Sequence, residues 1–194
     1  MARPRTFDPD TVLDAALRLF WSKGFHGTSF DDVTEATGLT KPSLYAAFGD
    51  KTELFRKALD RYHAHLLAIA EAELAKGPTA RDAIAAWLMD YIPRCSGTRG
   101  TRGCFSVNTL TDSALDDATI KKSSAKFYRD LEALIEARLT RGRAEFPAHF
   151  DAAGTARALV AAHTGLMVLA RDAPSAAETK AAMAQLLRLL DGAP

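Results

Sequence analysis

Apolar residues recur at spacings of three and four positions along almost the whole chain of 194 residues. This spacing collects them on one face of an α-helix. No run alternates β-branched and polar residues for long enough to predict a strand, and no internal repeat is present. The pattern therefore predicts an all-α fold.

Residues that favour helix ends divide the amino-terminal part into four predicted helices. Each begins at a side chain that can accept hydrogen bonds from the free N–H groups of the first turn: Asp8, Ser29, Thr40 and Asp50. Glycine, which readily takes the left-handed conformation that stops a helix, follows three of them: Gly24, Gly38 and Gly49. The fourth predicted helix is the longest of this group, over about 50–75.

The remainder of the chain is predicted to be helical as well. A break at 76–79 precedes a helix that begins at Thr79 or Arg81, and the glycine- and arginine-rich stretch 97–103 is predicted to be a loop. Further helices are expected over 104–115, 117–143, 151–172 and 175–191. We expect a first domain over residues 1–56 and a second over 57–194.

Residues 29–48 have the spacing of a helix-turn-helix motif, in which a three-residue turn containing Gly38 separates two short helices. Apolar residues from both helices can form a small shared core: Phe30, Val33, Leu39 and Leu44. The outward face of the second helix carries hydrogen-bond donors and no acid: Thr40, Lys41, Ser43 and Tyr45. A plain helical bundle has the same spacing, so the spacing alone leaves both interpretations open.

The charge of the chain gives little support to strong non-specific binding of nucleic acid. The whole sequence has 25 basic and 24 acidic residues, and the first 60 residues have eight Lys/Arg against nine Asp/Glu. Neutralisation of phosphates supplies much of the affinity of non-specific binders. A dimer that makes few contacts with each half-site is still compatible with this charge balance.

Three runs within residues 8–56 carry a close resemblance to a known family. They are AALRLF at 15–20, KGFHGTSFDDV at 23–33 and ATGLTKPSLYAAFGDKTELF at 36–55. Their order and spacing resemble the DNA-binding domain of TetR-family transcriptional regulators. The resemblance implies a homodimeric repressor that binds double-stranded operator DNA and has a helical carboxy-terminal domain for a small effector.

The resemblance also implies which residues meet DNA. Thr28 and Ser29 would contact phosphate at the start of the second helix, and Thr40 would cap the third. Three residues at the start of the third helix would face base edges: Lys41, Pro42 and Ser43. Tyr45 and Lys51 would hold phosphates, and a short basic arm would reach a groove: Arg3 and Arg5. Pro42 replaces the small residue that many members have, so the base preference is not transferred.

Two further sets of residues are assigned to the second domain. By resemblance, one set lies on the helices that line the effector cavity: Trp87, Tyr91, Phe105, Asn108, Phe127, His163 and Met167. Asn108 and His163 are the stronger candidates, because buried polar groups need partners and orient a ligand. The other set suits an interface between two copies of the last two helices, with an internal core as the alternative: Leu159, Ala162, Leu166, Met183, Leu186 and Leu190.

The composition excludes several other classes of protein. No uninterrupted run of about 18 apolar residues predicts a membrane helix, and the amino terminus does not resemble a signal peptide, so we expect a cytoplasmic protein without a membrane partner. The scattered histidines and the two cysteines do not form a metal-binding pattern. No cofactor motif is present, since the glycines of 97–103 are not followed by the Lys-Ser/Thr of a phosphate loop.

The cysteines leave one alternative mechanism open. Cys104 lies at the start of a predicted helix near Arg99 and Arg102, two conditions that favour a reactive thiolate. Cys95 lies nine residues earlier and could act as a resolving thiol. The regulator could therefore respond to oxidants or electrophiles, although a free cysteine is usually a small buried apolar residue. A helical enzyme or adaptor without DNA binding is an alternative of another class, but no nucleophile motif supports catalysis.

Overall fold

The computed structural model of the chain describes residues 7–90, 102–112, 115–169 and 175–191. Every regular element within these residues is helical, which confirms the predicted all-α fold. The α-helices are α1 (Pro9–Gly27), α2 (Phe30–Thr37), α3 (Lys41–Phe48), α4 (Lys51–Leu74), α5 (Ala80–Asp90), α7 (Phe105–Thr111), α8 (Ala118–Arg141), α9 (Ala152–Leu169) and α10 (Ala176–Leu187). Short 3-10 turns follow α8 and α10, at Arg143–Glu145 and Arg188–Asp191.

The predicted caps form the ends of the amino-terminal helices. Ser29 and Asp32 cap α2 reciprocally, because each side chain accepts the backbone N–H of the other, at 3.1 and 2.7 Å. Gly38 ends α2 in the left-handed conformation at φ +69°. Gly24 has φ +74° and interrupts α1 close to the predicted end, although helical turns continue to Gly27.

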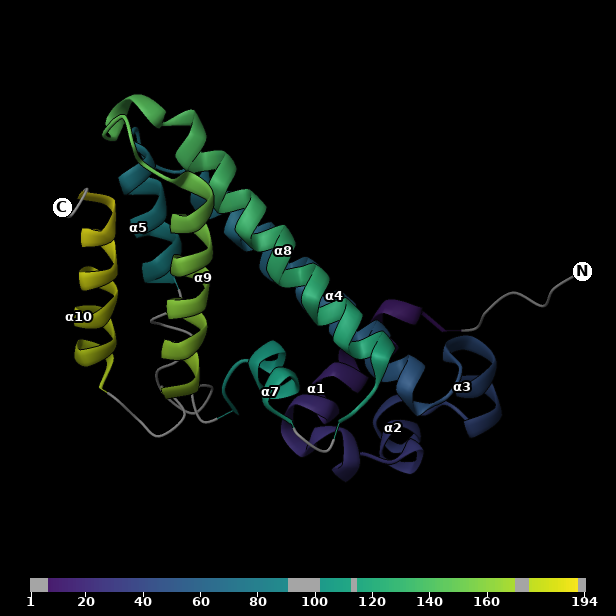
Figure 1. The fold of residues 1–194 in the computed structure, drawn as a ribbon. Coiled ribbons are helices and arrows are strands. Elements are labelled where there is room, and N and C mark those ends of the chain that lie inside the picture. Colours follow the sequence, from purple (N-terminus) through teal and green to yellow (C-terminus); the bar gives the residue numbers. More distant parts are fainter. Residues whose placement is uncertain (1–6, 91–101, 113–114, 170–174, 192–194) are drawn as a thin grey trace, which may run out of the picture.

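The helices form a head and a body joined by two long helices (Figure 1). The head consists of α1, α2 and α3, and the body contains α5, α9 and α10. The 24-residue helices α4 and α8 pack side by side between them. Because a helix rises 1.5 Å per residue, each is about 36 Å long and reaches from the head into the body.

Two apolar cores lie along this axis. The head core includes Phe20, Leu44 and Phe55, and it extends to Phe105 and Val107 of α7. The body core contains residues from α5, α8, α9 and α10: Ile84, Leu88, Ile135, Leu139, Leu159 and Met183. Helix α4 contributes to both cores, so the domain division predicted at residue 56 falls inside a continuous helix.

Helix α9 is apolar over most of its length, although it has no uninterrupted run of 18 apolar residues. By length and composition it is apolar enough to cross a membrane, since polar residues interrupt its apolar sequence only at a few positions. Its inner face packs on α8, and its buried His163 lies against Trp87 with ring centroids 4.6 Å apart. Its outer face leaves Val168 and Leu169 exposed. An exposed apolar helix face on a packed body is typical of contact with another protein chain.

Candidate nucleic-acid interface and adjoining cavity

Helix α3 is anchored by two buried side chains and presents the rest of its surface outward. Leu44 and Phe48 lie in the head core. Lys41, Pro42 and Tyr45 are exposed on the opposite side, as the sequence predicts for a recognition helix. The helix begins at Thr40, whose hydroxyl accepts the Ser43 N–H and lies 3.0 Å from the Ser43 hydroxyl.

Tyr45 is held in place although it is exposed. Its ring stacks on Phe30 of α2, with centroids 4.4 Å apart and planes 6° from parallel. The side chain is still 53% accessible to solvent. Phe30 therefore fixes the direction of the ring and leaves the phenol hydroxyl at the surface, where it can donate to a phosphate oxygen.

Lys41 forms an ion pair across the motif. Its Nζ lies 2.8 Å from a carboxylate oxygen of Asp31 at the start of α2. The hydrogen bond to Asp31 and its charge raise the pKa of Lys41 above the ordinary value. Both side chains are exposed, so solvent weakens the pair. Any further acceptor at Lys41 would therefore compete with Asp31 for its ammonium protons.

Two of the predicted contacts at the start of α2 differ in their exposure. Ser29 is exposed, and its hydroxyl and N–H are both bonded to Asp32. Thr28 is 1% exposed, and its hydroxyl donates to the carbonyl of Gly24 at 2.8 Å. The expectation that the Thr28 side chain meets phosphate is therefore corrected, because the bend after Gly24 turns this hydroxyl inward.

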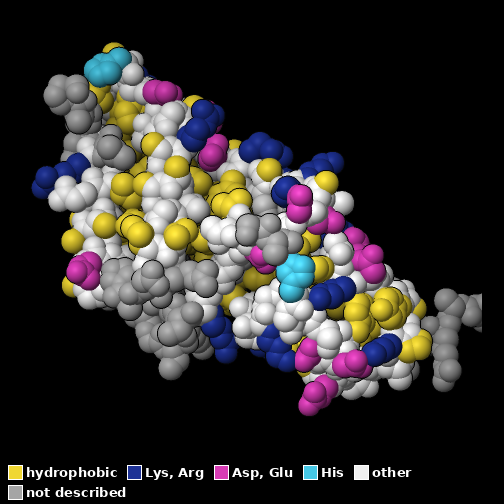
Figure 2. All heavy atoms as spheres, turned by 60° about the horizontal axis from the view of Figure 1, so that its bottom comes forward, with side chains coloured by type: hydrophobic (Ala, Val, Ile, Leu, Met, Phe, Trp, Pro, Cys, Tyr) yellow, Lys and Arg dark blue, Asp and Glu magenta, His cyan; other side chains and the backbone are white. Residues whose placement is uncertain are grey.

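The remaining predicted contacts lie at the start of α4 and at the amino terminus. Lys51 is the first residue of α4, and its Nζ lies 4.5 Å from the centroid of the Phe25 ring. This cation–π contact holds the ammonium group beside the motif. Arg3 and Arg5 lie outside the described residues. Acidic and basic side chains are interspersed on the head, in agreement with its balanced charge (Figure 2).

A cavity of about 690 Å³ lies where the head meets the body. Its wall combines side chains of α1, α4, α5, α7, α8 and α9. Aromatic residues supply much of this wall: Trp21, Tyr62, Trp87, Phe127 and Tyr128. The size and the largely apolar lining are typical of a site for a small organic molecule.

Polar groups on the wall are joined to one another and to the buried His63. His63 Nε2 of α4 lies 3.0 Å from the Ser106 hydroxyl of α7, which lies 3.5 Å from the Tyr128 hydroxyl of α8. The Tyr62 hydroxyl donates to Cys104 Sγ at 3.5 Å. Burial lowers the pKa of His63 from 6.5 to about 4, so its imidazole is neutral at pH 7.

The structure brings together part of the predicted effector set. Four of its residues line the cavity: Trp87, Phe127, His163 and Met167. Phe105 and Asn108 instead line a second hollow of about 490 Å³ between α1 and α7, and Phe105 packs in the head core. The structure therefore does not bring these two residues to the same cavity as the other four, because α7 turns them toward the head, and their role in effector binding stays a prediction. Tyr91 lies outside the described residues.

Sequence reasoning missed the wall residues that come from the head and from α4. Leu17, Arg18 and Trp21 of α1 line the cavity together with Tyr62 of α4. In the sequence, Leu17, Trp21 and Tyr62 look like ordinary apolar helix positions and Arg18 like a charged surface position, so none of them carries a separate signal. Only the packing of α1 against α4 and α7 directs them toward a cavity.

The residues predicted for the dimer interface fall into a buried group and a partly buried group. Leu159, Met183 and Leu190 are at most 4% exposed within the body core. They are therefore core residues rather than interface residues, which corrects that assignment. Ala162, Leu166 and Leu186 are partly buried. The exposed faces of α9 and α10 carry other, mostly small residues: Ala158, Ala161, Gly165, Leu169, Ala177, Ala181 and Ala184.

Comparison with known proteins shows to which family the chain belongs. A family model described as "Bacterial regulatory proteins, tetR family" matches residues 12–58, which hold the helix-turn-helix. The chain is 36% identical over 178 residues to the HTH-type transcriptional repressor ComR of Escherichia coli K12, a match that covers 89% of this chain and 84% of ComR. The chain belongs to the TetR family. It is a DNA-binding transcriptional regulator and not an enzyme.

Two further relatives match different lengths of this TetR-family chain. The repressor BdcR of E. coli K12 is 48% identical over 60 residues, which is 31% of this chain and 30% of BdcR. A cysteine-substituted variant of the TetR-family regulator CifR, crystallised with 26 bp operator DNA, is 31% identical. The two structures agree with a TM-score of 0.84 over 96% of this chain and 98% of the CifR chain.

Proposed function

We propose that this TetR-family regulator is a homodimeric repressor that leaves a pseudo-palindromic operator when a small molecule occupies the 690 Å³ cavity. The similarity to ComR, which is named a repressor, and to operator-bound CifR supports the DNA-binding part. We infer that the protein acts in the cytoplasm, where its DNA is.

One observation carries the effector part of the proposal. Helix α1 belongs to the DNA-binding head, yet its Leu17, Arg18 and Trp21 form part of the cavity wall. The Trp21 indole N–H also donates to the carbonyl of Gly103, just before α7, at 3.0 Å. A molecule that moves this wall moves α1 directly. Binding can thus change the spacing of two heads in a dimer.

The DNA contacts follow from the exposure of the head residues. Lys41, Pro42 and Ser43 face base edges at the start of α3, with Thr40 as its cap. Tyr45 and Lys51 hold phosphates, since Phe30 and Phe25 fix their side chains. Ser29 remains a phosphate contact of the α2 terminus, where the incoming anion competes with Asp32. Two such heads reach successive major grooves.

The exposed faces of α9 and α10 supply the dimer interface in this proposal. Small side chains allow two helix pairs to approach closely and form a four-helix contact. The exposed Leu169 adds apolar area at one end of this surface.

Selection of bound sequences from a random DNA pool tests the repressor part. We expect a pseudo-palindrome with half-sites about one helical turn apart. A library of small molecules is then screened for release of the protein from the selected DNA. The absence of any enriched sequence would contradict operator binding, and DNA binding insensitive to every cavity ligand would contradict effector release.

A specific observation also supports the thiol mechanism as a second candidate. Cys104 Sγ accepts a hydrogen bond from Tyr62 and lies on the cavity wall, although the residue is only 5% exposed. A small electrophile that enters the cavity would meet this thiol. Cys95 lies outside the described residues.

Iodoacetamide distinguishes the two candidates, because its reaction forms an S–C bond and releases iodide. Alkylation of Cys104 in the folded protein, with loss of operator binding, supports the thiol mechanism. A thiol that reacts only after unfolding leaves reversible effector binding as the mechanism.

A further inference from the structure

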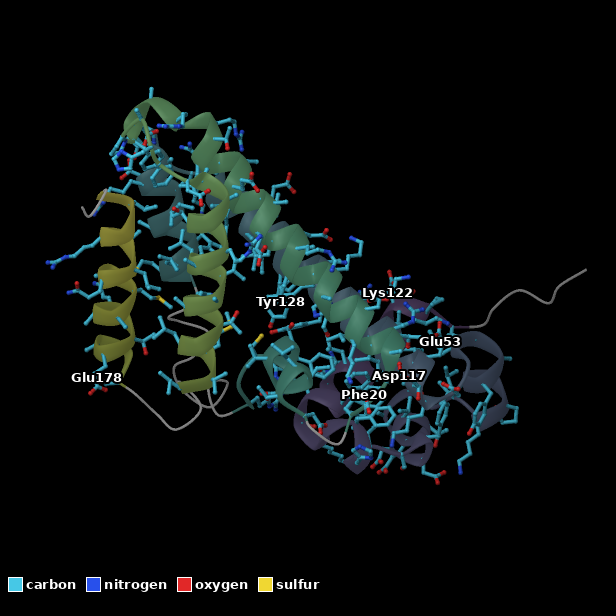
Figure 3. The ribbon with its side chains drawn as sticks, viewed as in Figure 1. Phe20, Glu53, Asp117, Lys122, Tyr128 and Glu178 are labelled. Carbon is cyan, nitrogen blue, oxygen red and sulfur yellow. The ribbon has the colours of Figure 1, made fainter. Side chains whose placement is uncertain are left out.

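Tyr128 stands at the end of a row of polar side chains that leads from α4 to the cavity. His63 is buried in α4, and its Nε2 lies 3.0 Å from Ser106 Oγ. Ser106 in turn donates to the Tyr128 hydroxyl at 3.5 Å. Tyr128 lies on the side of α8 that is turned toward α7 and α9 (Figure 3). Both Ser106 and Tyr128 line the cavity.

The hydrogen bonds of this row have a definite direction. A serine hydroxyl has one proton, and Ser106 donates it to Tyr128. Ser106 Oγ must therefore accept from His63, which requires the ring proton of His63 on Nε2. The neutral imidazole has only one ring proton, and burial keeps His63 neutral by lowering its pKa to about 4.

Tyr128 also interacts with the hydroxyl of Thr164 on α9. Burial raises the pKa of the Tyr128 phenol, while hydrogen bonds from Ser106 and Thr164 act in the opposite direction. The phenol thus stays protonated at pH 7 and accepts from two protein hydroxyls. A tyrosine hydroxyl that accepts twice still has its own proton to donate.

The surroundings of this donor suit an uncharged partner. Phe127 and Leu131 lie on α8 with Tyr128, and Met167 lies on α9. All three line the cavity and offer no countercharge. The charged lining residues come from α1, the segment before α7 and the end of α5: Arg18, Arg102 and Asp90. Both arginines are exposed to solvent, and Asp90 is partly exposed. A charged group beside Tyr128 would lose its hydration without an ion pair in return.

We propose that Tyr128 selects the effector by donating a hydrogen bond to the carbonyl oxygen of an uncharged, ring-containing molecule. Ser106 and His63 are positioning residues, because they orient the Tyr128 hydroxyl without touching the ligand carbonyl. The inference rests on the proposed function, because it assumes that the effector binds in the same cavity. Ligand binding itself is measured without DNA.

The test uses Prodan, an uncharged naphthalene ketone whose emission shifts to the red when its carbonyl accepts a hydrogen bond. Dimethylaminonaphthalene, which lacks the ketone, is the matched probe. The two tryptophans of the chain, Trp21 and Trp87, both line the cavity, so energy transfer from tryptophan to Prodan reports occupation of this site.

We expect Tyr128→Phe to weaken Prodan binding about fivefold, the loss expected for one neutral hydrogen bond. The emission of bound Prodan shifts to the blue, and the affinity for dimethylaminonaphthalene stays the same. Tyr62→Phe is the control, since this second cavity phenol donates to Cys104 instead. Ser106→Ala should weaken Prodan binding less than Tyr128→Phe does and leave the ketone-free probe unaffected.

Three results would overturn the proposal. They are a wild-type protein that does not bind Prodan, a Tyr128→Phe variant with unchanged Prodan emission, and an equal loss of both probes in that variant. Operator release is scored separately. If Tyr128 behaves as expected but no ligand releases DNA, the proposed function fails and the assignment of Tyr128 stands.

Discussion

At the scale of single residues, Lys41 forms an ion pair with a carboxylate from the other helix of the motif. Asp31 holds its ammonium group at 2.8 Å, so in the proposed function DNA competes with this partner. We expect Asp31→Asn to raise operator affinity about two- to fivefold, the range that exposed ion pairs contribute. Lys41→Ala should lower the affinity by at least about fivefold, as the loss of a base contact does.

Fluorescence anisotropy with labelled operator measures both effects. Glu35→Gln is the matched control for Asp31→Asn, because it removes the same charge from an exposed position of the same helix. An equal gain in both variants would show that only net charge matters. Unchanged affinity in Lys41→Ala would contradict the placement of α3 in the groove.

In the proposed function, Lys51 contributes a point charge beside phosphate. Lys51→Ala should lower affinity for all DNA sequences alike and reduce the slope of log affinity against log salt by about one. Titrations at several salt concentrations, on operator and on unrelated DNA, measure the slope. Lys180→Ala on α10 is the control, and a slope equal to that of this control would argue against a phosphate contact.

His63 makes the stability of the fold depend on pH. Its pKa is near 6.5 in the unfolded chain and about 4 in the folded protein, so the unfolded chain binds the proton more tightly. The contribution of neutral His63 is complete above pH 6.5 and is lost as pH falls toward 4. Between pH 7 and pH 5, the free energy of unfolding should decrease by about 2 kcal/mol from this group.

Urea unfolding at several pH values measures this loss. His63→Gln should reduce the pH dependence, whatever its effect on stability at pH 7. His65→Gln, at an exposed position of the same helix, is the control substitution. The same pH dependence in His63→Gln and wild type would contradict a buried neutral imidazole.

At the scale of elements, the turn between α2 and α3 depends on the backbone of Gly38. A methyl group there meets no atom within 4 Å, so Gly38→Ala tests conformation alone. At φ +69° alanine is strained, and we expect a loss of about 1 kcal/mol in the free energy of unfolding. Gly38→Asn should retain more stability, because asparagine tolerates this conformation. Thermal unfolding measures both, and equal stability of alanine and glycine would contradict the left-handed turn.

At the scale of the whole molecule, the dimer should depend on the exposed stripe of α9. Ala161→Glu or Gly165→Glu places a charge in the proposed contact, and we expect monomers that bind operator weakly, since one half-site provides too few contacts. Sedimentation velocity at micromolar concentration measures the mass. Ala133→Glu on the exposed face of α8 is the control and should remain dimeric. Dimers in both α9 variants would place the interface elsewhere.

The local features of the sequence determined the helices and the head. The Ser29 cap, the left-handed Gly38 and the inward Leu44 depend on residues a few positions apart, and the structure shows each of them as predicted. The motif runs of residues 15–55 were likewise sufficient to indicate the family, because they hold the order and spacing of its DNA-binding domain.

Only the tertiary structure decides which apolar helix faces are buried and which helices they pack against. Leu159 and Ala161 both lie on α9, yet Leu159 enters the body core and Ala161 is exposed, because only one side of α9 meets α8. The row from His63 through Ser106 to Tyr128 joins residues 43 and 22 positions apart. Helical periodicity specifies that a face is apolar or polar, but not which distant helix packs against it, and that packing creates the cavity.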